Sequence, residues 1–178
     1  MTTFAPHRKD TAPEGSVAAL EEVESAFGFI PNMMGVLAES PVAVKAYLDL
    51  VFGLERRGDL SSAERQFLMI AISAENGCEY CVPAHSAIAA QTGLTSEHTA
   101  AAASGAAVDD PRLTALRAFG LTMMEKRGRA SDGDVQAFLD AGFTKAQILE
   151  VIVCLAAKTL SNYANHIANV PLDPQFKS

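Results

Sequence analysis

The residues most suited to chemistry lie close together in the middle of the chain. Cys78 and Cys81 are separated by two residues, and His85 follows Cys81 by four positions. Because residues three, four and seven positions apart share one face of an α-helix, a helix would bring the two thiols and the imidazole together. The N–H groups and dipole at a helix start favour a thiolate, and a nearby imidazole can accept the thiol proton. The pattern therefore predicts a reactive dithiol in which His85 activates Cys81.

This dithiol has three interpretations. A peroxide can oxidise the thiolate to sulfenic acid, which the second thiol then converts into a reversible disulfide. A structural zinc site matches less well, because zinc usually takes four protein ligands and only Glu75 or His166 is left as a stretched fourth candidate. An inert pair of buried cysteines is the third interpretation. We favour redox chemistry, and we predict no metal and no other cofactor.

Residues that start and stop helices predict where the dithiol lies. A capping-box pattern opens the helix before it, and an Asn-Gly pair at 76–77 suits the left-handed conformation that closes a helix. The next helix is then expected to begin near Cys78 or Glu79. Pro83 must lie close to its first turn, because deeper in a helix the proline ring would clash with the carbonyl four residues earlier. We therefore expect Cys78 at the cap and Cys81 in the first turn.

The rest of the chain also predicts helices alone. It has 178 residues, of which 49% are hydrophobic, with no Trp and no long alternation typical of a β-strand. We predict one all-α domain over 15–178, after an arm at 1–14 that is mobile or becomes ordered only on a partner subunit. Segments 55–66 and 125–136 resemble each other, which suggests a duplicated helix–turn–helix core. Asn32 is expected to cap the second helix. Helices are expected at about 16–27, 32–37, 41–58, 61–76, 78–93, 96–103, 110–126, 131–140 and 144–169.

Charge and hydropathy exclude several classes of protein. The formal net charge is −7 and no basic stripe is present, so we predict no nucleic-acid partner. No apolar run approaches the ~18–20 residues of a membrane span, and residues 1–14 lack the apolar segment of a signal peptide. We therefore predict a cytoplasmic protein with no membrane partner. Cys154 lies in an apolar run and is expected to be a buried hydrophobic residue.

The residues around the dithiol resemble a known family. Residues 73–85, Ser-Ala-Glu-Asn-Gly-Cys-Glu-Tyr-Cys-Val-Pro-Ala-His, look like the core motif of the alkylhydroperoxidase D / carboxymuconolactone decarboxylase superfamily. Residues 30–41 resemble the segment before that core, and residues 160–166 with 171–173 resemble the C-terminal part of its peroxidase-related members. The resemblance implies an alkylhydroperoxidase D-like helical bundle that forms a trimer or hexamer. It also implies a peroxide substrate and a dithiol reductant, of the lipoyl type or thioredoxin-like.

The resemblance assigns roles within the dithiol. By motif position, Cys81 would be the peroxidatic cysteine that becomes sulfenic acid. Cys78 would be the more accessible resolving cysteine, and His85 would belong to the proton relay.

The chain also departs from the family pattern at two positions. Gln66 stands twelve residues before the first cysteine, where the alkylhydroperoxidases have a relay glutamate, and Tyr80 stands where they often have a histidine. A neutral amide does not accept a proton at working pH, so the relay would need another group. Glu75 and Glu64 are nearby carboxylates that could substitute, although a capping-box role is expected for Glu64.

Three functions therefore stand side by side. The first is a thiol-dependent oxidoreductase that reduces alkyl hydroperoxides through a sulfenate and disulfide cycle. The second is a carboxymuconolactone decarboxylase-type enzyme, whose chemistry has no evident need for a redox dithiol. The third is a non-catalytic, redox-sensing oligomer. His166 is expected to lie with Asn162 and Asn165 in a buried polar network rather than to act in catalysis.

Overall fold

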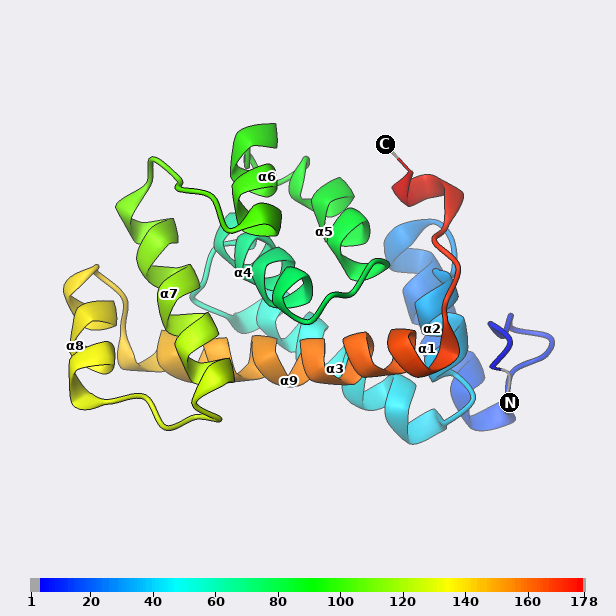
Figure 1. Cartoon of the computed structure of the whole chain (residues 1–178). Coiled ribbons are helices and arrows are strands. Elements are labelled where there is room, and N and C mark those ends of the chain that lie inside the picture. The colour runs from blue at the N-terminus through cyan, green and yellow to red at the C-terminus, as the bar shows by residue number, and fades with distance from the viewer. Residues whose placement is uncertain (1–3, 178) are drawn as a thin grey trace.

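The computed structural model describes residues 4–177, and these residues form a helical protein (Figure 1). They contain nine α-helices, one short 3₁₀ helix and no β-strand, which confirms the predicted all-α fold. No helix among them is long and apolar enough to cross a membrane. The helices are α1 (Glu14–Phe27), α2 (Asn32–Leu37), α3 (Pro41–Arg57), α4 (Ser62–Glu75), α5 (Cys81–Ala89), α6 (Ser96–Ser104), α7 (Pro111–Glu125), α8 (Asp132–Asp140), α9 (Lys145–Ala168) and the 3₁₀ helix η1 (Pro174–Phe176).

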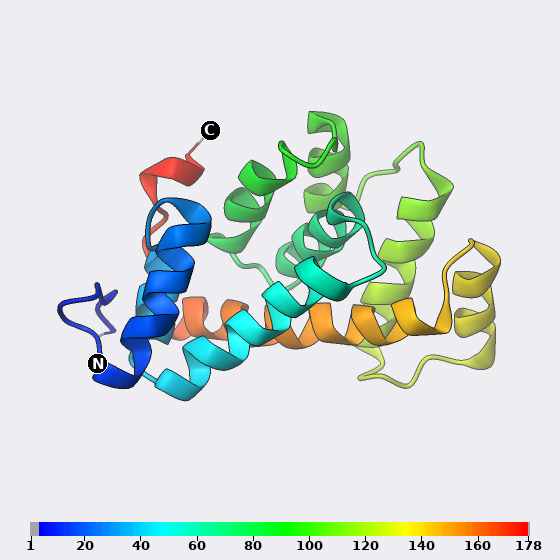
Figure 2. The same cartoon turned by 180° about the vertical axis from the view of Figure 1, so that it is seen from behind.

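The longest helix, α9, is the axis along which the others are arranged. α1 and α2 gather at one end of α9, α7 and α8 lie at the other end, and α4, α5 and α6 lie over its middle (Figures 1 and 2). α9 contacts α2, α3, α4 and α7, while α4 also contacts α5, α6 and α7. α4 is therefore enclosed on several sides. Its side chains Phe67, Leu68, Ile70 and Ile72 have almost no exposed surface.

Local capping explains where most of the helices begin. Ser40 caps α3, whose first residue is a proline. Ser61 and Glu64 cap each other at the start of α4, and Thr144 and Gln147 do the same at the start of α9. These starts agree with the predictions, because a capping box depends only on two residues three positions apart.

The helix that follows the dithiol turn differs from the prediction at both ends. It begins at Cys81, two or three residues later than expected, and it ends at Ala89, four residues early. Gly77 has a positive φ of 65°, and the N–H of Cys78 donates to the carbonyl of Ser73. The chain therefore closes α4 and makes a separate turn before α5 begins. Cys78 lies in that turn, outside the helix, whereas Cys81 lies in the first helical turn as expected.

α2 is capped by a residue from the other end of the chain. Asn32, which was expected to be the cap, is instead the first residue of the helix. Its backbone N–H donates to the carboxylate of Asp173 at 3.0 Å, and its side-chain amide donates to the carbonyl of Pro171 at 3.1 Å. Asp173 is buried and also accepts a hydrogen bond from the hydroxyl of Tyr80. The C-terminal segment therefore joins α2 to the dithiol turn.

The N-terminal segment packs on its own chain. Residues 1–3 of the expected arm lie outside the described residues, whereas the N–H of His7 donates to the carbonyl of Gly35 at 3.0 Å. The guanidinium of Arg8 donates to the carbonyl of Ile30 at 2.7 Å and to Asn32 at 2.9 Å. A Cβ at position 35 would lie 2.7 Å from the carbonyl oxygen of His7. The described part of the arm is thus ordered against α2 without a partner subunit.

The two similar segments, 55–66 and 125–136, form the same kind of junction. Each joins the end of one helix to a helix that starts with a capping box, at Ser61 in one case and at Ser131 in the other. The helices that enter these junctions also begin alike, with a capped proline at Pro41 and at Pro111. The second helix of each pair differs in length, 14 residues in α4 and 9 in α8. A duplicated core remains an interpretation of this likeness.

Replacement of the buried carboxylate tests the link between the C-terminal segment and α2. Asp173→Ala should lower the free energy of unfolding by about 1–3 kcal/mol, because it leaves the Tyr80 hydroxyl and an N–H of α2 without their acceptor. Tyr80→Phe should cost less, since Asp173 keeps its hydrogen bond from Asn32 and only the longer contact from the N–H of Met33, at 3.4 Å, loses its acceptor. Urea denaturation measures both, with the exposed Asp109→Ala as control. A loss at Asp173 no larger than that of the control would contradict the link.

Candidate active site

The two cysteines face the side chains of α9. Cys78 lies in the turn before α5, Cys81 is the first residue of α5, and His85 is one turn further along that helix. From α9, polar side chains at three- and four-residue spacing point toward them, because such residues share one helix face. These side chains are Lys158, Ser161, Asn162 and Asn165, and all four are buried.

Hydrogen-bond donors surround the sulfur of Cys81. The amide nitrogen of Asn165 lies 3.1 Å from the Sγ of Cys81 and 3.6 Å from the Sγ of Cys78, so one amide bridges both sulfurs. The hydroxyl of Ser161 is 4.0 Å from Cys81. The amide oxygen of Asn165 is buried and has no hydrogen-bond partner among the described residues. Asn165 thus presents its donor side to the thiols, which is the arrangement that favours a negatively charged sulfur.

The two thiols differ in acidity. The hydrogen bond from Cys78 and the positive charge of Lys158 hold the pKa of Cys81 well below that of an ordinary thiol, although burial acts in the opposite direction. The same hydrogen bond and burial raise the pKa of Cys78. The pair therefore carries one proton, on Cys78, and one thiolate, on Cys81. The third cysteine is different, because burial raises the pKa of Cys154 to about 12.

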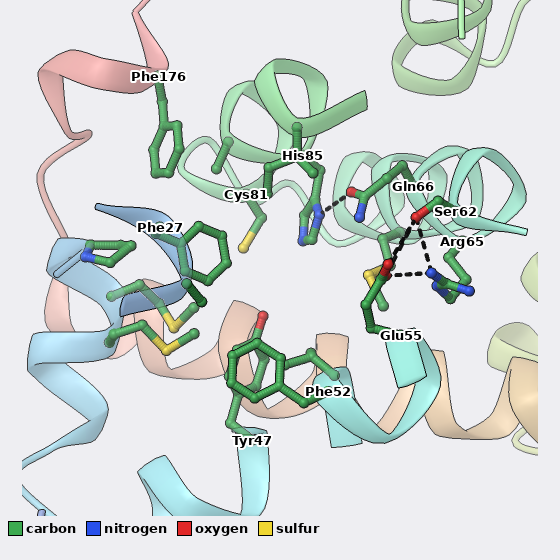
Figure 3. Close-up of a pocket in the computed structure, with 18 of the residues that line it drawn as sticks. Phe27, Tyr47, Phe52, Glu55, Ser62, Arg65, Gln66, Cys81, His85 and Phe176 are labelled. Atoms are coloured by element: carbon green, nitrogen blue, oxygen red, sulfur yellow. Dashed lines mark hydrogen bonds and ion pairs between the residues drawn. The ribbon is translucent and has the colours of Figure 1, made fainter. Parts of the chain in front are cut away.

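A hydrogen-bonded chain of three side chains runs beside Cys81. The Nε2 of His85 lies 2.8 Å from the ammonium of Lys158. Its Nδ1 lies 2.8 Å from the side-chain oxygen of Gln66 (Figure 3). Since that oxygen only accepts, we assign the ring proton to Nδ1, and Nε2 then accepts from Lys158. Burial, and then the charge of Lys158, lower the pKa of His85. His85 is therefore a neutral ring held between α4 and α9, and within the described residues it makes no hydrogen bond to a thiol.

The residues predicted for the proton relay lie in different parts of the structure. Gln66 reaches His85, but Glu64 lies in the capping box of α4 and forms an ion pair with Arg112. Glu75 is exposed at the end of α4. The hydroxyl of Tyr80 is engaged by Asp173. Of the two carboxylates considered, neither lies in the hydrogen-bonded chain beside Cys81.

Two expectations about accessibility are wrong. Cys78 was expected to be the more accessible thiol, yet both sulfurs are buried, at 1% exposure for Cys78 and 2% for Cys81. His166 was expected in a buried network, but it is exposed and stacks on Tyr163. His166 follows Asn165 by one residue, which is about 100° of rotation around the helix. Because Asn165 points inward, His166 lies on the outward face of α9.

A cavity of about 410 Å³ opens beside Cys81 (Figure 3). Cys81 and His85 line it, whereas Cys78 is not among its lining residues. Its volume falls in the range of small-molecule sites. One edge is polar, where Arg65 pairs with Glu55. The large apolar side chains of the wall are aromatic residues and methionines, namely Phe27, Met33, Met34, Tyr47, Phe52, Met69, Tyr80 and Phe176.

The sequence analysis missed Lys158, which is completely buried. Its signal is present in the sequence, because it lies four residues after Cys154 and seven after Val151, both on the core side of α9. A charge on the core side of an apolar helix needs a partner, so it is a candidate functional residue. The residue was overlooked because its partners lie more than seventy positions away.

No set of potential metal ligands accompanies the dithiol. Among the described residues, no group of three or more His, Cys, Asp and Glu side chains is arranged to hold a metal ion. His85 uses both ring nitrogens in hydrogen bonds to Lys158 and Gln66, and Glu75 and His166 are exposed. The geometry of these residues does not match the tetrahedral set that structural zinc requires.

The reactivity of the thiols tests their assigned acidity. In the reduced protein, iodoacetamide should modify Cys81 first at about pH 7, because only a thiolate is a good nucleophile. The rate should fall only when the solution becomes acidic enough to protonate Cys81, whereas Cys78 and Cys154 should react slowly throughout. Mass spectrometry of the modified peptides measures this order. Preferential modification of Cys78 would contradict it.

Comparisons with known proteins agree on this core. The sequence profile of the Carboxymuconolactone decarboxylase family matches residues 41–122, which include both thiols of the dithiol, His85 and Gln66. No curated protein sequence matches the chain significantly.

Solved structures extend the likeness to the whole chain. One is the alkylhydroperoxidase AhpD core of an uncharacterized peroxidase-related protein from Ralstonia eutropha JMP134, with a TM-score of 0.85, 24% identity, and coverage of 99% of this chain and 96% of that one. A peroxidase-related protein from Silicibacter sp. TM1040 has a TM-score of 0.79, 17% identity and coverage of 98% and 95%. A cysteine-to-alanine variant of the debrominase Bmp8 in complex with 2,3,4-tribromopyrrole has a TM-score of 0.78, 18% identity and coverage of 99% and 94%.

At these identities the solved structures establish the fold alone. The family profile adds the segment that carries the dithiol and the residues beside it. Together they show that the chain has this all-α fold and is similar to the Carboxymuconolactone decarboxylase family over residues 41–122, somewhat less than half of its length.

Proposed function

We propose that this protein is a thiol-dependent peroxidase that reduces organic hydroperoxides through Cys81 and Cys78. The observation that carries the proposal is the position of Cys81. Its sulfur lines an apolar cavity, has a lowered pKa, and shares the amide of Asn165 with a second thiol. A nucleophile next to a resolving thiol and a substrate-sized cavity is the arrangement that peroxide reduction requires.

The reaction balances with a dithiol as the reductant. The Cys81 thiolate attacks the terminal oxygen of the hydroperoxide, the O–O bond breaks, and the alkoxide takes one proton to leave as an alcohol. Cys81 is then a sulfenic acid. The Cys78 thiol attacks its sulfur, forming the disulfide and releasing water. An external dithiol reduces this disulfide and is itself oxidised, which restores both thiols.

The buried sulfurs also constrain the reductant. Neither thiol is exposed, so a thioredoxin-like protein would have to bring its own cysteine into the interior. A narrow dithiol of the lipoyl type could instead reach Cys81 through the cavity that serves the substrate. We therefore favour a lipoyl-type reductant over a thioredoxin-like protein.

A second candidate reaction is removal of a halogen from a flat, electron-rich ring. Five aromatic side chains line the cavity and suit a planar ligand, namely Phe27, Tyr47, Phe52, Tyr80 and Phe176. A debrominase shares the fold. Cys81 would take the halogen as a sulfenyl halide while the ring carbon takes a proton. Cys78 would then displace the halide ion and form the disulfide. This route uses the same two thiols and the same dithiol reductant.

The two remaining functions differ in what they ask of the dithiol. A decarboxylase of the carboxymuconolactone type has no need for a thiolate beside a resolving thiol. A redox-sensing oligomer would form the disulfide once and would not turn over. Steady-state consumption of cumene hydroperoxide and of a brominated pyrrole, each with a dithiol donor, separates the first two functions from each other and from these two.

Single cysteine variants test the division of labour between the thiols. Cys81→Ser should abolish reaction with hydroperoxide, because the nucleophile is lost. Cys78→Ser should consume one equivalent and then stop, because the sulfenic acid lacks its resolving thiol. Dimedone trapping and thiol counts measure both, and mild oxidation of the wild type should remove two thiols. Cys154→Ala is the control. Because Cys154 has no part in the proposed cycle, this variant should behave as the wild type. Sulfenic acid trapped on Cys78 in Cys81→Ser would reverse the assignment.

We also propose that the protein is a homo-oligomer, a trimer or a hexamer. Support comes from α9, where large apolar side chains are exposed at Leu149, Ile152, Tyr163 and Ile167. Their spacing places them within one face of the helix. Such a continuous exposed apolar face is typical of an interaction surface.

A charge on this face of α9 should weaken assembly. Ile167→Asp is expected to lower the molar mass in solution at micromolar concentration, because burying an unpaired carboxylate in an apolar interface is costly. Ala107→Asp, in an exposed loop, is the matched control. Light scattering coupled to size exclusion measures the mass of each. A wild-type protein that is already a monomer would refute the proposal.

A further inference from the structure

Lys158 is a buried charge without a carboxylate partner. Its side chain has no exposed surface, although it projects from the middle of α9. Within residues 4–177, none of the ion pairs formed by the acidic side chains includes Lys158. A buried ammonium without a counterion is costly, so lysine is almost never completely buried unless it is paired. Its position therefore requires another negatively charged group.

The groups around Lys158 and Cys81 leave one candidate. From α5, His85 is a neutral ring that accepts a hydrogen bond from the ammonium. From α4, Gln66 is a neutral amide. From α3, Tyr47 keeps its proton, because burial raises the pKa of its hydroxyl. From the turn before α5, Cys78 keeps its proton as well. Of these groups, only Cys81 can carry a negative charge, and the positive charge of Lys158 is one cause of its lowered pKa.

The geometry points to Lys158 as the counterion of the Cys81 thiolate and as the donor of the proton that the leaving alkoxide takes. His85 orients the ammonium, because its Nε2 accepts one of the three N–H bonds. The other two remain for Cys81, whose pKa the charge of Lys158 lowers, and for a ligand beside His85, which lines the cavity. Gln66 in turn holds the His85 ring in that tautomer. The counterion role does not depend on the proposed function, whereas the proton-donor role rests on it.

In each cycle Lys158 gives up one proton and takes one back. When the thiolate breaks the O–O bond, the alkoxide takes a proton from the ammonium and leaves as an alcohol, so Lys158 becomes a neutral amine. Disulfide formation releases water and changes no charge. When the dithiol reduces the disulfide, Cys81 returns as a thiol and passes its proton to the amine. The thiolate and the ammonium are then both restored.

This assignment gives a physical reason for the amide at position 66. A glutamate there would lie against the Nδ1 of His85, where its charge would favour the protonated ring. A protonated His85 could no longer accept from Lys158. The carboxylate would also compete with the thiolate as the counterion of the ammonium. A neutral Gln66 avoids both effects, so the lysine does the work that a relay carboxylate would do elsewhere.

Lysine variants and a pH titration test the counterion. The rate of iodoacetamide modification at Cys81 is measured from acid to alkaline pH and located by mass spectrometry. In Lys158→Met, the midpoint should move upward by about 1–3 pH units, because an opposite charge nearby lowers a pKa by that amount. Lys158→Gln should behave like Lys158→Met and is measured beside it, so that the result does not depend on the folding of one variant. Lys158→Arg should keep the wild-type midpoint.

Single-turnover kinetics test the proton donor. Above its midpoint, Lys158→Arg retains the thiolate but holds its proton too tightly to give it up, so the reaction with cumene hydroperoxide should be about a hundredfold slower or more. Lys126→Met removes an exposed lysine and should match the wild type in both experiments.

The outcomes separate the two roles from the proposed function. An unmoved midpoint in Lys158→Met and Lys158→Gln would overturn the counterion role. A Lys158→Arg protein as fast as the wild type would overturn the proton-donor role. A wild type that consumes no hydroperoxide would refute the proposed function, while the titration would still decide the counterion.

Discussion

A lysine ammonium without exposed surface imposes the strongest constraint on this structure. Moving such a charge out of water costs several kcal/mol unless the interior provides partners. The chain provides them from two directions, with the Nε2 of His85 on α5 and, through it, the amide of Gln66 on α4. Asn165 on the same face of α9 bridges both sulfurs of the dithiol. Lys158, His85, Gln66 and Asn165 therefore form a polar seam, which links the helices that meet at the dithiol inside an otherwise apolar core.

This seam lies between two features that a reaction would need. On one side is the cavity, whose aromatic and methionine side chains form the apolar part of the wall around Cys81. On the other side a second polar contact fixes the helix packing, where Asn76 donates to Asn162 at 2.8 Å. The C-terminal segment completes the wall, because Asp173 engages Tyr80 and Phe176 packs edge-on against the same ring. A low-polarity surrounding strengthens any charge pair within it, so the walls and the seam act together.

The neutral side chains near the dithiol matter as much as the charged ones. His85 follows Cys81 by one helical turn and has the residue type of a general base, yet its hydrogen bonds are to Gln66 and Lys158. Its lowered pKa keeps it neutral, so it positions a neighbour and carries no charge of its own. An amide at position 66 is then consistent with the rest of the network. The departure from the family pattern and the buried lysine have a single explanation.

The sequence by itself determined the helices and part of the site. Capping boxes such as Ser61 with Glu64 join residues three positions apart, so they can be read without knowing the fold. The same reasoning placed Cys81 in a first helical turn and gave Glu64 a capping-box role, while leaving it as a relay candidate. It placed the start of α5 too early, because the turn after Gly77 depends on hydrogen bonds back to α4.

Only the tertiary structure decided which groups share the space around Cys81. Lys158 lies 73 positions from His85 along the chain, Asn165 lies 84 from Cys81, and Asp173 lies 141 from Asn32. No local pattern encodes such pairs, since they arise from how α9 and the C-terminal segment pack against the rest. The burial of a side chain, which shifts the pKa of each thiol, is likewise a property of the whole packing. The sequence therefore predicted which two sulfurs form the dithiol, and the packing around them decides in which direction the pKa of each is shifted.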